Sequence, residues 1–346
     1  MASSVRVAGV GCGFFAGNHY NSWNDLKGEG AELVAVCDID AKKAEVTAKK
    51  FGVPKWYTDF DEMLAKEKID LLDVITRMDT HRMLVEKSIG KKIATIVQKP
   101  FAPDWNDCVA MTAAADKASV FLAVHENFRF QAPLIRVKRV IESGEIGAPT
   151  WARVSFRTGY DIYSGQPYFY DEIRFIILDL GIHTLDIARF LLGEVDLVSC
   201  QTQRRNPKVK AEDTVTAILR HTSGAVSVND FSYESRRLPD TFPNTLLEIE
   251  GPKGAIVVDN DFKMRVAVDG KLRLEDLGTP LLSWTSHPWH VAQESVLNTC
   301  RNMLSAFRTG RDADTSARDN LKTYAVAEAC YESAEKGTMV HPRHFP

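Results

Sequence analysis

Two carboxylates and an imidazole recur at helical spacing in the segment ILDLGIHTLDIARFLLG, residues 177–193. If this segment is helical, Asp179, His183 and Asp186 lie at positions i, i+4 and i+7 and share one face. Apolar residues cover most of the remaining surface, whereas a solvent-facing helix usually has a broad polar face. We therefore interpret the stripe as carboxylates and an imidazole held against a cleft. An ordinary amphipathic helix whose Asp and His meet water is the alternative.

A lysine at a strand end could act with this stripe. Lys99 lies in Gln98-Lys99-Pro100, directly after the apolar run at residues 95–97, and Pro100 restricts Lys99 to extended backbone. Open parallel sheets bind ligands at the carboxyl ends of their strands, where Thr76 also falls. An ammonium there could stabilise negative charge developing on a reacting oxygen, and a neutral imidazole could accept a proton. A solvated lysine at a strand end is the plainer interpretation.

The first third of the chain predicts a dinucleotide site beside Lys99. A strand at residues 5–10 runs into the turn Gly9-Val10-Gly11-Cys12-Gly13, and a helix follows. Glycines permit a tight turn against a pyrophosphate, which the helix amino end attracts. Phe14 stands where the strict pattern has Gly or Ala, and such a turn alone is weak evidence. Asp38 directly follows the strand at residues 33–37. Its carboxylate would accept hydrogen bonds from the ribose hydroxyls and repel a 2′-phosphate, so NAD is favoured over NADP. Asp38 could instead cap the next helix.

The order of elements predicts an α/β chain with two domains. Strands at residues 5–10, 33–37, 71–75, 95–97 and 120–124 alternate with helices, which indicates a doubly wound parallel sheet over residues 1–125. Residues 126–346 contain the paired strand signals 213–220 with 225–233, 246–250 with 255–258, and 264–268 with 272–274. This second domain is expected to have a large, open, mostly antiparallel sheet with helices on one side. The C-terminal helix could pack back on the first domain.

Composition excludes several classes of protein. A net charge of -3 over 346 residues argues against a nucleic-acid partner, and no apolar run approaches the ~18 residues of a membrane span. Six separated cysteines without C-x-x-C suit reduced thiols, so a cytoplasmic location is expected. The H-x-x-H pairs at His287 and His341 contain prolines and have no neighbouring cysteines, so no metal site is expected. The nucleophile motif G-x-S-x-G is absent.

Taken together, these motifs resemble the Gfo/Idh/MocA oxidoreductases over essentially the whole chain. The resemblance rests on the glycine-rich turn through His19, Asp38, the Thr76–His81 segment and the pattern Asp179-x-Gly181-x-His183-x-x-Asp186. It also rests on Gln98-Lys99-Pro100, where the family has Glu-Lys-Pro, and on Asn127-Phe128-Arg129-Phe130. It implies an N-terminal Rossmann domain, a Lys-Pro peptide that is often cis, and catalytic roles for Lys99, Asp179 and His183. The neutral amide of Gln98 removes a negative charge beside Lys99, which puts the usual tuning of that lysine in doubt.

The resemblance further implies NAD-dependent oxidation of a sugar, with the anomeric hydroxyl of an aldose converted to a lactone. Alternatives are an inositol, xylose or other polyol dehydrogenase, an enzyme that oxidises its substrate transiently, and a non-catalytic NAD(H)-binding sensor. Cofactor contacts are expected from Gly11, Gly13, Phe14, Phe15, Asp38, Thr76, His81, Gln98 and Lys99. Substrate contacts are expected from Lys99, Asn127, Arg129, Tyr160, Asp179 and His183. A homodimer or homotetramer is expected to form through the C-terminal sheet.

Overall fold

A computed structural model describes residues 4–345 and divides them into two compact units. The first contains the chain up to Asn127 together with Gln293–Leu321, and the second contains Phe128–Ala292 and the chain from Lys322 onward. The first change of unit falls between Asn127 and Phe128. The chain then returns to the first unit, which receives most of helix α9 (His290–Thr309), and most of α10 (Ala317–Lys336) belongs to the second.

The first unit is built on a six-stranded parallel sheet of order β3-β2-β1-β4-β5-β6. Its strands are β1 (Val5–Val10), β2 (Ala31–Cys37), β3 (Trp56–Tyr57), β4 (Leu71–Val74), β5 (Ala94–Gln98) and β6 (Leu122–His125). β4, β5 and β6 are buried throughout, as expected of parallel strands covered on both faces. The expected doubly wound parallel sheet is confirmed.

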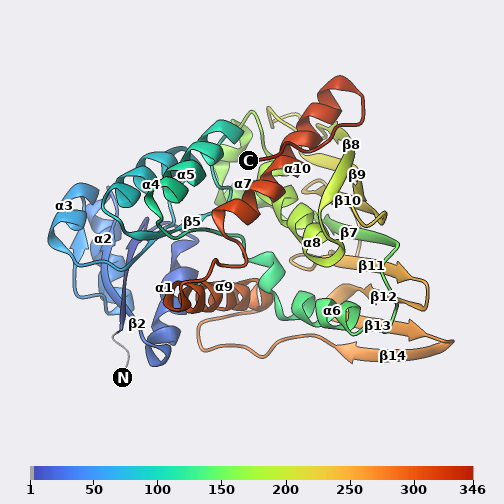
Figure 1. Ribbon diagram of the computed structural model, residues 1–346, viewed down its shortest axis with the longest axis horizontal. Coiled ribbons are helices and arrows are strands. Elements are labelled where there is room, and N and C mark those ends of the chain that lie inside the picture. The colour runs from blue at the N-terminus through green and yellow to red at the C-terminus, as the bar shows by residue number, and fades with distance from the viewer. Residues whose placement is uncertain (1–3, 346) are drawn as a thin grey trace. The chain divides into compact units, whose positions relative to one another are not determined.

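Helices cover this sheet, and the glycine-rich turn leads directly into the first of them. They are α1 (Ala16–Asp25), α2 (Ala41–Phe51), α3 (Phe60–Lys66), α4 (His81–Gly90), α5 (Trp105–Ala118) and α9, with short turns η1 (Leu26–Glu29) and η2 (Met78–Thr80). α4 and α5 lie side by side (Figure 1). Two arginines tie α9 to the turn η1 and the residue after it: Arg301 pairs with Glu29 at 2.9 Å, and Arg308 donates to the Gly30 carbonyl at 2.7 Å.

The second unit contains an eight-stranded sheet of order β14-β13-β12-β11-β7-β10-β9-β8 (Figure 1). Its strands are β7 (Trp151–Arg157), β8 (Val195–Gln203), β9 (Thr214–His221), β10 (Val226–Ser232), β11 (Leu246–Gly251), β12 (Gly254–Val258), β13 (Lys263–Val268) and β14 (Lys271–Asp276). The expected mostly antiparallel sheet is confirmed, and the three expected strand pairs are β9–β10, β11–β12 and β13–β14. β10 and β7 run parallel, and β8 was not expected from the sequence.

The helices of the second unit include the segment that carries Asp179 and His183. They are η3 (Phe128–Phe130), α6 (Ala132–Glu142), α7 (Ile162–Gly165), η4 (Pro167–Tyr170), η5 (Ile177–Gly181), α8 (Ile182–Leu192), η6 (Asn260–Phe262) and α10. The segment is helical as expected, but it opens with the π-helical turn η5. A π turn contains an extra residue, so Asp179 and His183 do not have the ideal α-helical spacing that the sequence suggested.

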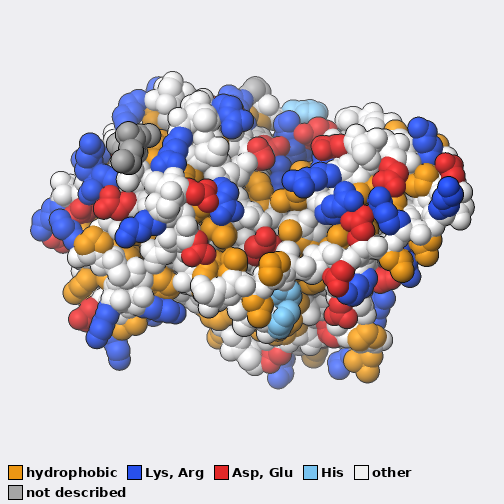
Figure 2. All heavy atoms as spheres, turned by 90° about the horizontal axis from the view of Figure 1, so that it is seen from below, with side chains coloured by type: hydrophobic (Ala, Val, Ile, Leu, Met, Phe, Trp, Pro, Cys, Tyr) orange, Lys and Arg blue, Asp and Glu red, His pale blue; other side chains and the backbone are white. Residues whose placement is uncertain are grey.

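Lys and Arg side chains are scattered among Asp and Glu on the face shown in Figure 2, without one dominant sign of charge. Within residues 4–345, none of the helices combines the length and apolarity that a membrane span needs.

Candidate active site

The glycine-rich turn after β1 leaves open backbone in front of helix α1. Gly11 has φ 101°, and a Cβ there would lie 2.6 Å from the Ile75 carbonyl oxygen, so only glycine fits. A Cβ on Gly13 would meet nothing within 4 Å. No side chain caps the amino end of α1, and Phe14 beside it is 88% exposed. An open turn facing an uncapped helix amino end fits a pyrophosphate.

The sequence left two roles open for Asp38, binding of ribose hydroxyls and capping of the next helix, and the structure assigns the cap to Asp40. The Asp40 carboxylate caps α2 by accepting from the backbone N–H groups of Lys42 and Lys43. Asp38 accepts instead from the Cys12 N–H at 2.7 Å and from the Asp40 N–H at 2.9 Å. These bonds hold its carboxylate at the end of β2 beside the glycine-rich turn, a position suited to ribose hydroxyls.

Thr76, in the loop after β4, and His81, the first residue of α4, are tied to the chain after Lys99. His81 is buried, with Nε2 3.1 Å from the Thr76 carbonyl and Nδ1 3.1 Å from the Phe101 carbonyl. Burial lowers the pKa of His81, which favours the neutral ring. The structure therefore places His81 as a link between two loops. The Lys99–Pro100 peptide is cis, as the family resemblance implied.

Gln98 connects Lys99 to the interior of the first unit. Its side-chain oxygen accepts from the Lys99 backbone N–H at 2.6 Å, and its amide nitrogen lies 3.0 Å from His19 Nε2. The imidazole of His19 in turn lies 2.8 Å from Asp73 at the end of β4. Lys99 itself is half-buried.

In the second unit, strand β10 and its continuation position the turn that carries Asp179. Tyr233 donates from its hydroxyl to Asp179 Oδ2 at 2.9 Å. The same two segments also meet at Gly181, two residues after Asp179, and Phe231, two residues before Tyr233. A Cβ on Gly181 would lie 2.6 Å from the Phe231 ring. Glycine at this position of the motif thus lets the π turn lie directly on β10. Tyr233 is a residue that its sequence context did not predict for the site, since its only signal is its position at the end of an expected strand.

His183 stands at the beginning of a row of aromatic rings. Its imidazole stacks on Phe128 with ring centroids 3.8 Å apart and an interplanar angle of 7°. The row continues through Phe156 and Phe242 to Tyr160, which stacks on Phe242 at 4.1 Å. Tyr160 is 38% exposed, so the expected substrate residue offers an accessible ring within the same unit as His183.

The third member of the stripe, Asp186, does not face a cleft. It is fully buried and accepts from Arg129 Nε at 2.7 Å and from Thr323 Oγ1 at 2.8 Å, with a second Arg129 nitrogen also in contact. The expected stripe is wrong at this position, because α8 is enclosed on its Asp186 side. Arg129 is committed to this pair, which favours a structural role over direct contact with substrate. Asn127, in the first unit, donates to Ser295 Oγ at 2.7 Å.

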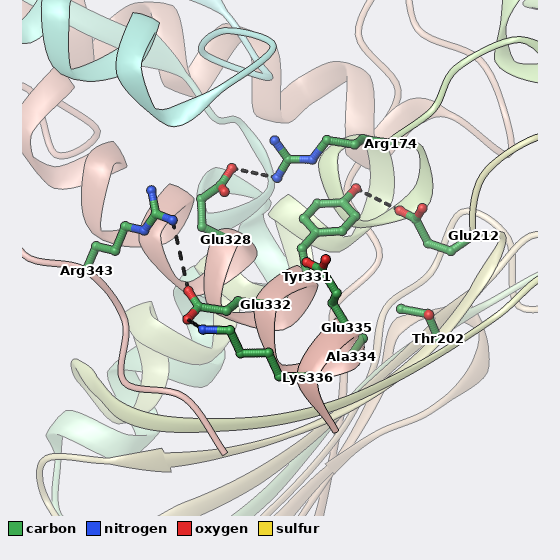
Figure 3. Close-up of a pocket in the computed structure, with 10 residues that line it drawn as sticks. All are labelled: Arg174, Thr202, Glu212, Glu328, Tyr331, Glu332, Ala334, Glu335, Lys336 and Arg343. Atoms are coloured by element: carbon green, nitrogen blue, oxygen red, sulfur yellow. Dashed lines mark hydrogen bonds and ion pairs between the residues drawn. The ribbon is translucent and has the colours of Figure 1, made fainter. Parts of the chain in front are cut away.

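A surface pocket of about 680 Å³ lies elsewhere in the second unit, around the end of α10 (Figure 3). Most of its charged side chains form ion pairs or hydrogen bonds with other residues of the pocket. Arg174 pairs with Glu328, Tyr331 donates to Glu212, and Glu332 pairs with Lys336 and Arg343. The pocket contains none of the expected site residues, so the candidate active site does not lie there.

Comparisons with known proteins match both units to one family. Residues 5–126 match the family model of the Gfo/Idh/MocA oxidoreductases, described as an NAD-binding Rossmann fold, and residues 134–257 match the model of the C-terminal domain of that family. A D-apiose dehydrogenase of Rhizobium rhizogenes is 44% identical over 98% of this chain and 97% of its own. Another from Paraburkholderia graminis is 44% identical over 96% and 88%. The crystal structure of an oxidoreductase from Agrobacterium radiobacter with NAD+, L-tartaric acid and magnesium superposes with a TM-score of 0.95 at 44% identity, covering 98% of both chains.

Proposed function

The chain belongs to the Gfo/Idh/MocA family of NAD-binding oxidoreductases, and from this premise we propose that it oxidises the anomeric hydroxyl of D-apiose to a lactone. The observation that carries the proposal is full-length similarity to two D-apiose dehydrogenases, in a chain whose Lys99, Asp179 and His183 are all present. The 44% identity extends over both units, so it includes the segments expected to contact the sugar.

We assign a proton-transfer role to His183. As a neutral imidazole it accepts the proton of the anomeric hydroxyl while hydride leaves the carbon. Stacking on Phe128 holds the plane of the ring, which reduces the rotational freedom that a proton acceptor must lose. Bound NAD+ supplies the hydride acceptor.

Lys99 and Asp179 complete the proposed catalytic set. Lys99 donates a hydrogen bond to the reacting oxygen and stabilises its developing negative charge. Asp179 binds a neighbouring sugar hydroxyl or orients His183, and the hydrogen bond from Tyr233 fixes its carboxylate. Asn127 and Tyr160 are proposed as further substrate contacts, with the Tyr160 ring available to pack against the apolar face of the sugar.

We also propose that the protein forms a homodimer or homotetramer through the open face of the second-unit sheet. Helix α8 covers one face against β7 and β10. The opposite face carries Ile218, which is 48% exposed, and the half-buried Val226, Val228 and Val257. The same face carries Arg153, which pairs with Asp230 at 3.0 Å, so a self-complementary interface there would combine apolar contacts with ion-paired side chains.

Deuterium labelling tests the proposed reaction directly. Purified protein is incubated with NAD+ and D-apiose carrying deuterium at C1, and the reduced cofactor is analysed by mass spectrometry. We expect NADH to accumulate with one deuterium and the sugar to become an aldonolactone. Turnover that leaves deuterium on the sugar would show oxidation at another carbon.

A parallel screen with myo-inositol, D-xylose and D-apiose distinguishes the substrates, and Lys99→Ala and His183→Ala serve as catalytic controls. Each variant should lose roughly 10²–10⁴ in kcat. Turnover of inositol but not of D-apiose would overturn the substrate assignment. Binding of NADH without turnover of any sugar would indicate a sensor instead.

A further inference from the structure

A continuous run of hydrogen bonds crosses the interior of the first unit and ends at Lys99. Asp73 Oδ2, at the end of β4, receives Trp23 Nε1 at 2.7 Å and lies 2.8 Å from His19 Nδ1. His19 Nε2 lies 3.0 Å from the Gln98 amide nitrogen, and the Gln98 oxygen accepts from the Lys99 N–H at 2.6 Å. Asp73 and His19 are fully buried, and Gln98 is 7% exposed.

The donors and acceptors along this run fix the positions of the protons. A backbone N–H can only donate, so the Gln98 atom that faces Lys99 must be the oxygen. The Gln98 NH₂ group therefore faces His19, and it too can only donate. His19 Nε2 must then be the acceptor and carry no proton, which leaves the ring proton on Nδ1, directed at Asp73.

A metal ion is the obvious alternative occupant of this region. The ligand atoms of His19, His125 and Cys300 lie within 4.8 Å of one another, and all three residues are buried. However, both nitrogens of His19 already have protein partners. The Cys300 thiol also has a protein partner, since its Sγ lies 3.7 Å from His125 Nε2. The cluster therefore fits a protein hydrogen-bond network better than a metal site.

We propose that His19 and Asp73 are positioning residues for Lys99, acting through Gln98, and that the run requires His19 to be the neutral Nδ1–H tautomer. The inference rests on the proposed role of Lys99 in the reaction. Asp73 orients the imidazole, the imidazole Nε2 orients the Gln98 amide, and the amide oxygen holds the Lys99 backbone at the end of β5. Three side chains, from α1, β4 and β5, thus fix the position of the Lys99 backbone from which the lysine side chain extends.

The proposal also explains what the amide at position 98 does. A carboxylate there could accept from the Lys99 N–H, but it could not donate to His19 Nε2. The ring would then need a second proton between two carboxylates, and a full negative charge would lie one residue from the Lys99 ammonium. Gln98 satisfies both neighbours without this charge.

The tautomer can be tested without any activity measurement. Two-bond ¹H–¹⁵N correlation spectra of the full-length protein distinguish a protonated from an unprotonated ring nitrogen, and the His19 signals are identified by their loss in His19→Gln. We expect protonated Nδ1 and unprotonated Nε2 in the wild type, and both nitrogens protonated in Gln98→Glu. A wild-type ring protonated on Nε2 would overturn the proposal.

Two matched substitutions of His19 separate its two hydrogen bonds. Gln at position 19 places a polar atom near the site of Nε2 and can still accept from Gln98, whereas Asn places one near Nδ1 and can donate only to Asp73. We expect His19→Asn to lower kcat by about 10²-fold, the cost of a small misplacement, with little change in the KM for NAD+. His19→Gln should retain at least ten times the kcat of His19→Asn.

Equal loss in both variants, at matched melting temperatures, would show that the link to Gln98 does not position Lys99. If both variants fail to fold, Gln98→Met gives the same test from the other side, because it keeps the volume and removes both bonds. The proposed reaction fails separately: if Lys99→Ala kept normal turnover, Lys99 would lose its catalytic role while the spectra would still report the tautomer.

Discussion

The hydroxyl of Tyr233 lies 2.9 Å from Asp179 Oδ2 and donates to it. Burial, reinforced by Asp179, raises the pKa of Tyr233 well above its usual value, so the hydroxyl keeps its proton through the neutral range. Tyr233 therefore remains a hydrogen-bond donor to Asp179 at neutral pH. Its acceptor is one of the three proposed catalytic residues, and its donor lies just beyond β10.

Tyr233→Phe removes this bond and keeps the ring. We expect kcat/KM for the sugar to fall roughly 10–100-fold, the effect of a hydrogen bond to a charged group, while the KM for NAD+ stays the same. Tyr163→Phe is the matched control, since its hydroxyl contacts Glu234 at 3.3 Å and touches no proposed catalytic residue. Equal activity of the two variants would show that Asp179 does not depend on Tyr233.

Asp38 and Asp40 provide a second matched pair. Asp38→Ala removes the proposed acceptor of the ribose hydroxyls, and we expect the KM for NAD+ to rise roughly 10–100-fold. Asp40→Ala removes the cap of α2, which should cost about 1 kcal/mol of stability and leave that KM unchanged. Cofactor kinetics and thermal melting of both variants check the assignment. A KM effect from Asp40 alone would reverse the two roles.

Gly181→Ala tests the close packing of the π turn on Phe231. The added methyl would lie 2.6 Å from the ring, so we expect a loss of about 1–3 kcal/mol of stability from overpacking. Gly90→Ala is the control, because its Cβ would meet nothing within 4 Å and alanine favours the helix. In a double-mutant cycle, Phe231→Leu should make Gly181→Ala less destabilising. Strict additivity would rule out the clash.

Arg129→Met and Asp186→Leu separate the structural role of the buried pair from substrate contact. Either change alone removes one member of a buried ion pair and should cost about 3–5 kcal/mol, whereas the double variant should lose far less. Arg189, whose Nη1 lies 3.9 Å from Asp186 Oδ1, is unchanged in all three variants. Chemical denaturation of the three variants measures this difference. If the folded double variant showed a strongly raised KM for the sugar, Arg129 would contact the substrate after all.

The sequence was sufficient where local chemistry determines structure. Apolar runs and turn residues predicted both sheets, and the paired strand signals at residues 264–268 and 272–274 predicted the β13–β14 pair. It was insufficient where a role depends on a partner distant in sequence. Nothing near Asp186 indicated that Arg129 would neutralise it, and nothing near Asp179 indicated Tyr233.

Helical periodicity failed for a different reason. The pattern at residues 177–193 fits an uninterrupted α-helix, but Gly181 must approach Phe231, and the backbone widens into a π turn just before α8. β8 was missed because its side chains, half-buried at several positions, give a weak alternation. Tertiary contacts decided both outcomes.

The return of the chain to the first unit has a consequence for synthesis on the ribosome. The Rossmann sheet is complete at His125, but α9, which buries Leu297, Met303 and Leu304, is translated only after residues 128–292. At about 5–20 residues per second, this interval lasts on the order of 10–30 s. During it, the nascent first unit lacks the helix that buries these side chains, and neither unit corresponds to one continuous piece of the gene.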